Sequence, residues 1–218
     1  MDCGLIRSVV LSAGALFTCW FTCGLTCTAQ SVNPADLAQG KILVMHRDAP
    51  DPLFARSVIV LAHFDQTGAL GLMIHYRSDI PIRRALAGIA GAENRTDPIF
   101  VGGPVELPGV LALLRSATPP KGAQNDAKKV IGDLYMLSSR QSIGAAMSEG
   151  RKPSELRIFA GYAGWGPGQL AREMRLNGWY IFDYDERLVF DQHPETLWQR
   201  LIDRTELKKI LFPWPDVQ

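Results

Sequence analysis

Residues 8–35 contain no Asp, Glu, Lys or Arg, although charged side chains make up 21% of the 218-residue chain. Arg7 precedes this block, an apolar run extends from Val9 to Phe21, and small residues continue to Ala29. A basic residue followed by an apolar run and then by small residues is typical of a secretory leader. The run is also close to the roughly 20 residues that an uncleaved membrane anchor needs.

The charge-free block is therefore set apart before the fold is considered. We expect a signal peptide or membrane anchor over residues 1–30, a linker over 31–36, one domain over 37–205 and a C-terminal tail over 206–218. The protein would then be exported, either periplasmic or membrane-anchored, and would touch the membrane only through its first segment. The alternative is a start codon assigned too far upstream, which would make the protein cytoplasmic.

The cysteines lie in the expected leader, and the histidines are scattered through the rest of the chain. The cysteines are Cys3, Cys19, Cys23 and Cys27, and the histidines are His46, His63, His75 and His193. The domain thus has no thiol, which excludes disulfides, cysteine-protease chemistry and thiol redox chemistry. No histidine stands at the spacing of a metal site, so we expect no metal and no cofactor.

The charge of the chain is balanced, with 23 basic and 22 acidic residues and a net charge of +1. Removing the leader takes away Arg7 and Asp2 together, so the net charge does not change. The basic pairs Arg83-Arg84, Lys128-Lys129 and Lys208-Lys209 are short and scattered. Nucleic-acid-binding proteins concentrate such residues in a stripe, so we do not expect direct nucleic-acid binding.

Short apolar runs predict strands, and apolar residues at helical spacing predict helices. The predicted strands cover 42–45, 57–62, 70–75, 99–101, 156–160 and 179–182, and a further apolar segment covers 109–114. The predicted helices cover 82–89, 141–149 behind a Ser138-Ser139 cap, 169–177, and a last one beginning near Pro194. The polar segment 119–129 is expected to be exposed. This irregular alternation favours a single α+β domain with a mixed sheet.

The segment from Gly161 to Gly168 reads Gly-Tyr-Ala-Gly-Trp-Gly-Pro-Gly and lies between a predicted strand and a predicted helix. A helix start can bind phosphate, but a Walker loop needs a Lys and a hydroxyl residue after its last glycine. A Rossmann fingerprint needs Gly or Ala where Gln169 stands. We expect the glycines to supply positive φ and to let Trp165 pack against backbone. A small polar or anionic ligand at the helix start is the alternative.

Four segments, taken in order, resemble the YqgE/AlgH family. They are Asp51 to Val58, Gly68 to Leu72, Gly102 to Val105, and Gly161 to Leu170, and Trp179, Phe190 and Trp198 fit the same pattern. The resemblance covers about Leu37 to Thr205. It implies an α+β domain with a bifurcated sheet flanked by helices, in bacterial proteins mostly regarded as cytoplasmic and of unassigned activity. One relative is described as a transcriptional regulator of exopolysaccharide synthesis.

Two positions differ from the family pattern. His75 stands where the family usually has Asn, and Phe64 stands where it usually has His, with His63 just before. The chain also has no recognisable helix-turn-helix, so a regulatory effect through DNA would be indirect.

The distinctive residues are glycines, prolines and tryptophans, which shape backbone and surface but do not transfer protons at neutral pH. We therefore expect a noncatalytic binding or regulatory domain with a recess at its glycine loops, for a small polar or anionic ligand or a protein partner. The expected recess residues are Gly102, Gly103, Pro104, Gly161, Tyr162, Gly164, Trp165, Gly168, Gln169 and Glu173.

Two alternatives remain open. The first is a hydrolase-type enzyme that uses His75 with Glu173 or Asp51 as general acid and base. The second is a structural or interaction protein of the cell envelope, suggested by the leader and by the Trp-containing tail.

Overall fold

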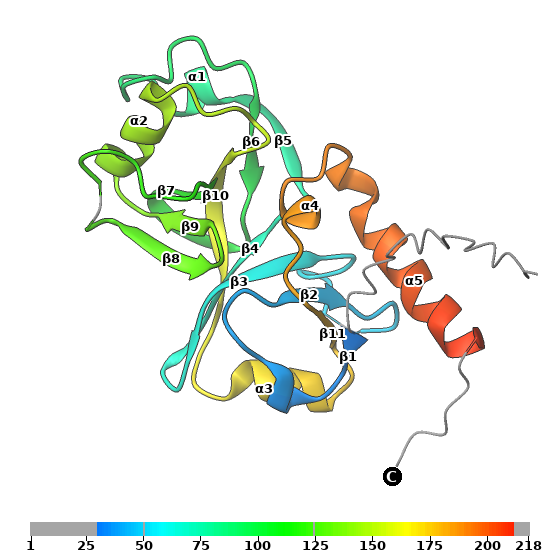
Figure 1. The fold of residues 1–218 in the computed structure, drawn as a ribbon. Coiled ribbons are helices and arrows are strands. Elements are labelled where there is room, and N and C mark those ends of the chain that lie inside the picture. The colour runs from blue at the N-terminus through cyan, green and yellow to red at the C-terminus, as the bar shows by residue number, and fades with distance from the viewer. Residues whose placement is uncertain (1–29, 50, 124, 212–218) are drawn as a thin grey trace, which may run out of the picture.

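The computed structural model describes residues 30–49, 51–123 and 125–211. Within them, eleven strands form one curled sheet with helices packed around it (Figure 1). The strands are β1 (Gln30–Ser31), β2 (Ile42–Met45), β3 (Val58–Asp65), β4 (Gly68–Met73), β5 (Arg77–Pro81), β6 (Pro98–Val101), β7 (Val105–Arg115), β8 (Ala127–Ile131), β9 (Leu134–Leu137), β10 (Leu156–Trp165) and β11 (Trp179–Phe182). The expected α+β class is confirmed.

The helices are mostly short. They are η1 (Pro34–Asp36), α1 (Ile82–Ala85), α2 (Arg140–Ser148), α3 (Gln169–Arg175), α4 (Glu186–Val189), η2 (Pro194–Thr196) and α5 (Leu197–Leu211). Ser139 caps α2, as the sequence predicts, and the side chains of Ser139 and Ser142 form a reciprocal capping box. The helix predicted over 82–89 is shorter than expected and ends at Ala85.

The sheet runs in the order β1-β11-β2-β3-β4-β10-β7-β9-β8, and β5 and β6 lie off this path. In the described part of the chain, β6 and β10 pair in parallel and the other pairs are antiparallel, so the sheet is mixed, as expected. The family resemblance implies a bifurcated sheet. The structure instead has one continuous curl, in which β10 pairs with β4, β6 and β7. Strand twist accumulates over so many strands and bends the sheet around its core.

Strand β10 changes partners at Gly161. Its first half pairs with β6 and β7, its last three residues pair with β4, and the register shifts between Ala160 and Tyr162. Gly161 has φ of +72°, which a side chain would strain. The stretch expected to be a glycine loop is therefore mostly strand, since β10 continues to Trp165 and only residues 166–168 connect it to α3.

The turn after β6 packs against the same point of β10. A Cβ atom on Gly102 would lie 2.2 Å from the carbonyl oxygen of Gly161, and one on Gly103 would lie 2.2 Å from the carbonyl carbon of Tyr162. The Gly102 amide donates to the Ala160 carbonyl at 2.7 Å, and the Gly102 carbonyl accepts from the Met73 amide at 2.8 Å. These glycines therefore allow direct backbone contact between β4, β6 and β10.

Apolar side chains on both faces of the sheet are buried. In β2, Ile42 and Val44 face one apolar cluster, while Leu43 and Met45 face another. The first cluster lies under α4 and α5, and the second lies under α3, which contributes Leu170 and Met174. A third cluster packs α1 and α2 against β7, β9 and β10. Strands covered on both sides are continuous apolar runs, which is why the sequence reveals them.

The two ends of the chain differ from the expected boundaries. The segment expected to be a linker contains Ser31 of β1, which pairs with β11, and the short helix η1. At the other end, α5 continues to Leu211, beyond Thr205. The predicted leader covers residues 1–30, of which Gln30 belongs to β1. Residues 1–29 and 212–218 lie outside the described residues. Among the helices that the structure describes, none combines the length and the apolar character needed to cross a membrane.

Several elements are not predicted from sequence. Strands β5, β8 and β9 are short, and β8 begins inside the polar segment expected to be exposed.

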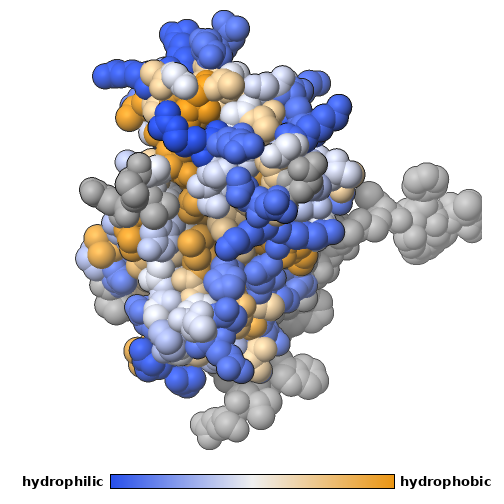
Figure 2. All heavy atoms as spheres, turned by 90° about the vertical axis from the view of Figure 1, so that its left-hand side faces the viewer, coloured by the Kyte–Doolittle hydropathy of each residue, from blue (hydrophilic) through white to orange (hydrophobic). Residues whose placement is uncertain are grey.

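Figure 2 shows the face that lies at the left of Figure 1, where apolar residues form separate patches between hydrophilic ones.

The backbone contact at Gly102 gives a stability prediction. Gly102→Ala places a methyl group on the Gly161 carbonyl oxygen, so we expect the free energy of unfolding to fall by about 2 kcal/mol or more. Gly109→Ala is the matched control, because nothing lies within 4 Å of the added Cβ and its φ is not positive. Urea unfolding of both variants tests this, and equal midpoints would contradict the role assigned to Gly102.

Candidate functional site

A hollow of about 420 Å³ lies beside the glycine loop. It is lined by Phe64, Asp65, Gln66, Gly68, Ala69, Gly166, Gly168, Leu170 and Ala171. Of the ten residues expected to form the recess, Gly168 is the one that lines this hollow. Its walls are mainly apolar, and hydrogen bonds from Thr67 to the Asp65 carboxylate lower the pKa of Asp65. A carboxylate that stays ionised at this position repels an anionic ligand.

The other expected residues have structural contacts. Gly102, Gly103 and Gly161 form the backbone contact described above, and Tyr162, Gly164 and Trp165 belong to β10. Pro104 is exposed beside them. The prediction placed a recess between the two glycine segments, and in the structure their backbones are in direct contact there.

Glu173 and Gln169 form a hydrogen-bond network with two indoles. The Glu173 carboxylate accepts from Nε1 of Trp165 at 3.0 Å and from Nε1 of Trp179 at 2.9 Å. The Gln169 amide donates to the same carboxylate at 3.1 Å and its oxygen accepts from the Gly166 amide. Buried indole N–H groups need an acceptor, so this network anchors α3 to β10 and β11.

The proposed pairing of His75 with a carboxylate finds no support among the described contacts. Nδ1 of His75 lies 3.2 Å from the Val58 amide nitrogen and 3.4 Å from its carbonyl oxygen. Glu173 is occupied by the indoles, and Asp51 accepts from the Leu53 amide. Burial lowers the pKa of His75 from its ordinary value of 6.5, opposed by the backbone contact with Val58. The lowered pKa favours the neutral form of the ring at pH 7.

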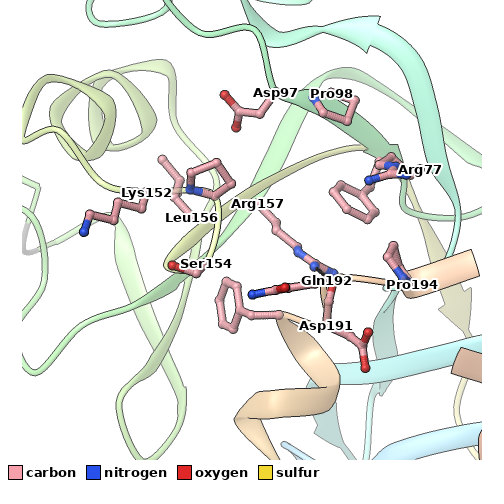
Figure 3. A pocket seen from close by; sticks show the side chains of 13 residues that line it. Arg77, Asp97, Pro98, Lys152, Ser154, Leu156, Arg157, Asp191, Gln192 and Pro194 are labelled. Carbon is pink, nitrogen blue, oxygen red and sulfur yellow. Dashed lines mark hydrogen bonds between the residues drawn. The ribbon is translucent and has the colours of Figure 1, made fainter.

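A second pocket, of about 410 Å³, opens between β6, the start of β10 and the segment after α4 (Figure 3). It is lined by Arg77, Asp97, Pro98, Phe100, Lys152, Pro153, Ser154, Leu156, Arg157, Phe190, Asp191, Gln192 and Pro194. Its volume falls within the range of about 300–1,000 Å³ that is usual for small-molecule sites. Sequence reasoning did not anticipate this pocket.

Arg157 is the buried cation of this pocket, with 7% of its surface exposed. Nη1 donates to the carbonyl of Ile74 at 3.3 Å, and Nη2 donates to the carbonyl of Asp191. The guanidinium lies 4.5 Å from the ring centre of Phe100 and 5.8 Å from that of Phe190. Among the described residues, its hydrogen-bond acceptors are thus backbone carbonyls and not carboxylates.

The electrostatics leave Arg157 charged. Burial lowers its pKa, Asp191 partly opposes this and nearby Arg77 adds to it, so that the pKa is about 10. At neutral pH the side chain is therefore a cation. The two acids of the pocket have partners outside it, because Arg95 pairs with Asp97 at 2.5 Å and Arg200 pairs with Asp191 at 2.6 Å.

The sequence does contain a sign of this site. Arg157 interrupts the apolar run of Leu156, Ile158 and Phe159 in a strand that is buried on both faces. A charged residue inside such a strand is rarely buried unless it is paired. The pocket itself could not be read from the sequence, because its walls come from four distant segments.

The described residues contain no group of three or more His, Cys, Asp or Glu side chains arranged to hold a metal ion.

Comparison with known proteins bears on the family. The DUF179 family model, described as AlgH-like, matches residues 42–209. This chain belongs to the AlgH-like family. A UPF0301 protein of Chlorobium luteolum is 30% identical over 167 residues, covering 76% of this chain and 85% of that protein. A UPF0301 protein of Streptomyces avermitilis is 32% identical over 173 residues, with the same coverage.

Solved structures of AlgH-like proteins have a similar fold. The solution structure of AlgH from Pseudomonas aeruginosa matches with a TM-score of 0.61 and 26% identity, covering 82% of this chain and 95% of that one. Protein DIP2367 of Corynebacterium diphtheriae matches with a TM-score of 0.63 and 26% identity, covering 78% and 87%. The names of these proteins state no activity, so function has to be argued from the geometry.

The indole network gives a second prediction. Glu173→Ala leaves two buried indole N–H groups without an acceptor, so we expect a loss of about 2 kcal/mol in the free energy of unfolding. Tryptophan fluorescence of the folded protein should change as well. Glu93→Ala, at an exposed position, is the control. Unchanged stability and emission in Glu173→Ala would show that the carboxylate does not hold the indoles.

The buried ring of His75 predicts a pH dependence. Because its pKa is lowered in the folded state, the unfolded chain binds the proton more readily below pH 6.5. The contribution to stability is present above that pH and is lost as pH falls toward the folded pKa, at up to about 1.4 kcal/mol per pH unit. Between pH 5 and 7.5, the unfolding free energy of His75→Asn should change less steeply with pH than that of the unmodified protein. The exposed control His193→Asn should keep the slope of the unmodified protein.

Proposed function

We propose that this chain is a noncatalytic binding domain that takes a small anionic ligand in the pocket around Arg157. The carrying observation is a buried guanidinium that faces a pocket. Among the described residues its hydrogen-bond acceptors are backbone carbonyls, and the nearby Asp191 carboxylate is already paired with Arg200. A buried cation is costly unless an anion compensates it. A bound carboxylate or phosphate would supply that anion.

Arg77 supports an anionic ligand from the edge of the pocket. It lies close enough to Arg157 to disfavour the charge of that residue, and its own ion-pair contact, with Glu195, is long at 3.8 Å. Two neighbouring guanidinium groups repel each other, and an anion between them relieves the repulsion. Arginine is also the residue best suited to bind planar or tetrahedral oxyanions through paired hydrogen bonds.

The lining argues for binding rather than catalysis. As the described residues line it, the pocket contains neither His nor Cys, and both of its carboxylates are paired with arginines outside it. Ser154 is exposed at the rim, and the lining supplies no unpaired base to activate it. The site we propose is thus distinct from the glycine recess expected from the sequence, although the binding role is the same.

A binding experiment tests the proposal. Acetate, benzoate and inorganic phosphate are titrated into the isotope-labelled protein, with benzylamine as the cationic control. We expect the anions, and not benzylamine, to shift the amide signals of residues 152–157 and 190–194. Arg77→Gln should weaken anion binding roughly tenfold, the scale of one lost charged hydrogen bond, whereas Arg83→Gln on α1 should not. An anion panel that leaves the pocket signals unmoved would refute the proposal.

Arg157 itself requires a separate variant, because its hydrogen bonds also hold Ile74 and Asp191. Arg157→Met is informative only where the protein remains folded. Ser154→Trp keeps the buried arginine and fills the pocket from its rim, so we expect it to abolish anion binding while the unfolding temperature stays near that of the unmodified chain.

A further inference from the structure

The pocket has a charged part and an apolar part. In Figure 3, Arg157 lies near the centre of the view with Gln192 and Asp191 close by, Arg77 lies on one side, and Leu156 and Ser154 lie on the other. Lys152 points away from the remaining side chains. The polar groups that can hold a ligand are therefore concentrated at one place, and the rest of the ligand has to meet the other walls.

Apolar groups line much of the pocket, together with Ser154 and Lys152. Three prolines, Pro98, Pro153 and Pro194, line the pocket together with Leu156 and the rings of Phe100 and Phe190. A proline has no N–H donor, so these positions offer little hydrogen bonding to hydroxyl or amide groups of a ligand. A polar ligand body would lose its contacts with water here without replacing them.

The acids of the pocket limit the ligand further. Asp97 and Asp191 are held in ion pairs by Arg95 and Arg200, so part of their capacity to accept hydrogen bonds from a sugar or a base is already used. Sugars and nucleosides need several such acceptors. The walls thus disfavour nucleotides and sugar phosphates, although their phosphate groups would suit the arginines.

Resting on the proposed function, we infer that the ligand is an amphipathic organic acid. Its oxyanion head lies against Arg157 and Arg77, and its ring or alkyl body lies against the proline-rich walls of the pocket. The head is a carboxylate or a phosphate, since both bind arginine in the same way. The site therefore selects among organic acids by the ring or alkyl part of the ligand.

Matched ligands separate head from body. Cyclohexanecarboxylate, its hydroxyl-rich analogue quinate, acetate, cyclohexyl phosphate and neutral cyclohexanemethanol are titrated into the protein by calorimetry. We expect cyclohexanecarboxylate to bind at least about tenfold tighter than acetate or quinate, the scale expected from burying about two methylene groups. Cyclohexanemethanol should bind at least about tenfold more weakly than cyclohexanecarboxylate. Comparing cyclohexyl phosphate with cyclohexanecarboxylate shows which head group is preferred. Cyclohexyl phosphate should also bind more tightly than inorganic phosphate.

Two variants test whether the apolar lining of the pocket causes the preference for cyclohexanecarboxylate. Arg77→Gln should weaken all the anions by the same factor, because it changes only the head site. Pro153→Ser, at the exposed rim, should reduce the preference for cyclohexanecarboxylate over quinate about threefold and leave acetate unchanged. Equal effects of Pro153→Ser on all three would overturn the assignment of the body to these walls.

The outcomes distinguish this inference from the proposed function. If acetate, phosphate and quinate bind at the arginines as tightly as cyclohexanecarboxylate, the anion site stands and the apolar ligand class is wrong. If none of the anions binds in the pocket, the proposed function itself fails.

Discussion

The fold depends on one strand, β10, being shared by three neighbours. Its first half pairs with β6 and β7, and its end pairs with β4, so a single strand joins the two parts of the curled sheet. The exchange of partners requires backbone to touch backbone, which is possible because Gly102, Gly103 and Gly161 have no side chains. The conformational freedom of glycine is usually a cost to folding. Here the freedom is used at the point where three strands meet.

The same strand carries the buried charge. Arg157 lies in β10, four residues before Gly161. Its side chain donates hydrogen bonds to the carbonyls of Ile74, just after β4, and of Asp191, just after α4. The arginine therefore holds separate segments together, and the pocket is the space left beside it. Removing a guanidinium from water costs free energy, and its contacts with backbone carbonyls and aromatic rings offset only part of that cost. A ligand that completes its coordination would also fasten the segments that the arginine touches.

Polar side chains of this chain have two kinds of environment. The Glu173 carboxylate is satisfied by two indoles and an amide, and His75 is held in its neutral form by burial. Such groups stabilise the fold and leave little capacity for chemistry. Arg157 and Arg77 differ, because their donors face a pocket and their carboxylate partners are distant or absent among the described residues. This contrast directs the search for function to the second pocket and away from the glycine loop.

Local pattern was enough for the elements whose signal is local. The apolar runs of β2, β3, β10 and β11 predicted strands because both faces of those strands are buried, and Ser139 marked the start of α2 because a cap is a contact within one turn. The family followed from four segments in register. The glycines marked the critical contact, although the sequence suggested a hollow where the structure has close packing.

The tertiary structure alone decided where a ligand can bind. The walls of the Arg157 pocket come from β5, β6, β10 and the segment after α4, which are far apart in sequence and meet only because β10 is shared. Nothing within one segment specifies such a meeting. The sequence by itself determined the class of fold, the family and the absence of thiol chemistry from the domain, because these depend on composition and on neighbouring residues. The position of the charge, its partners and the shape around it depend on long-range packing, and only the folded chain supplies that.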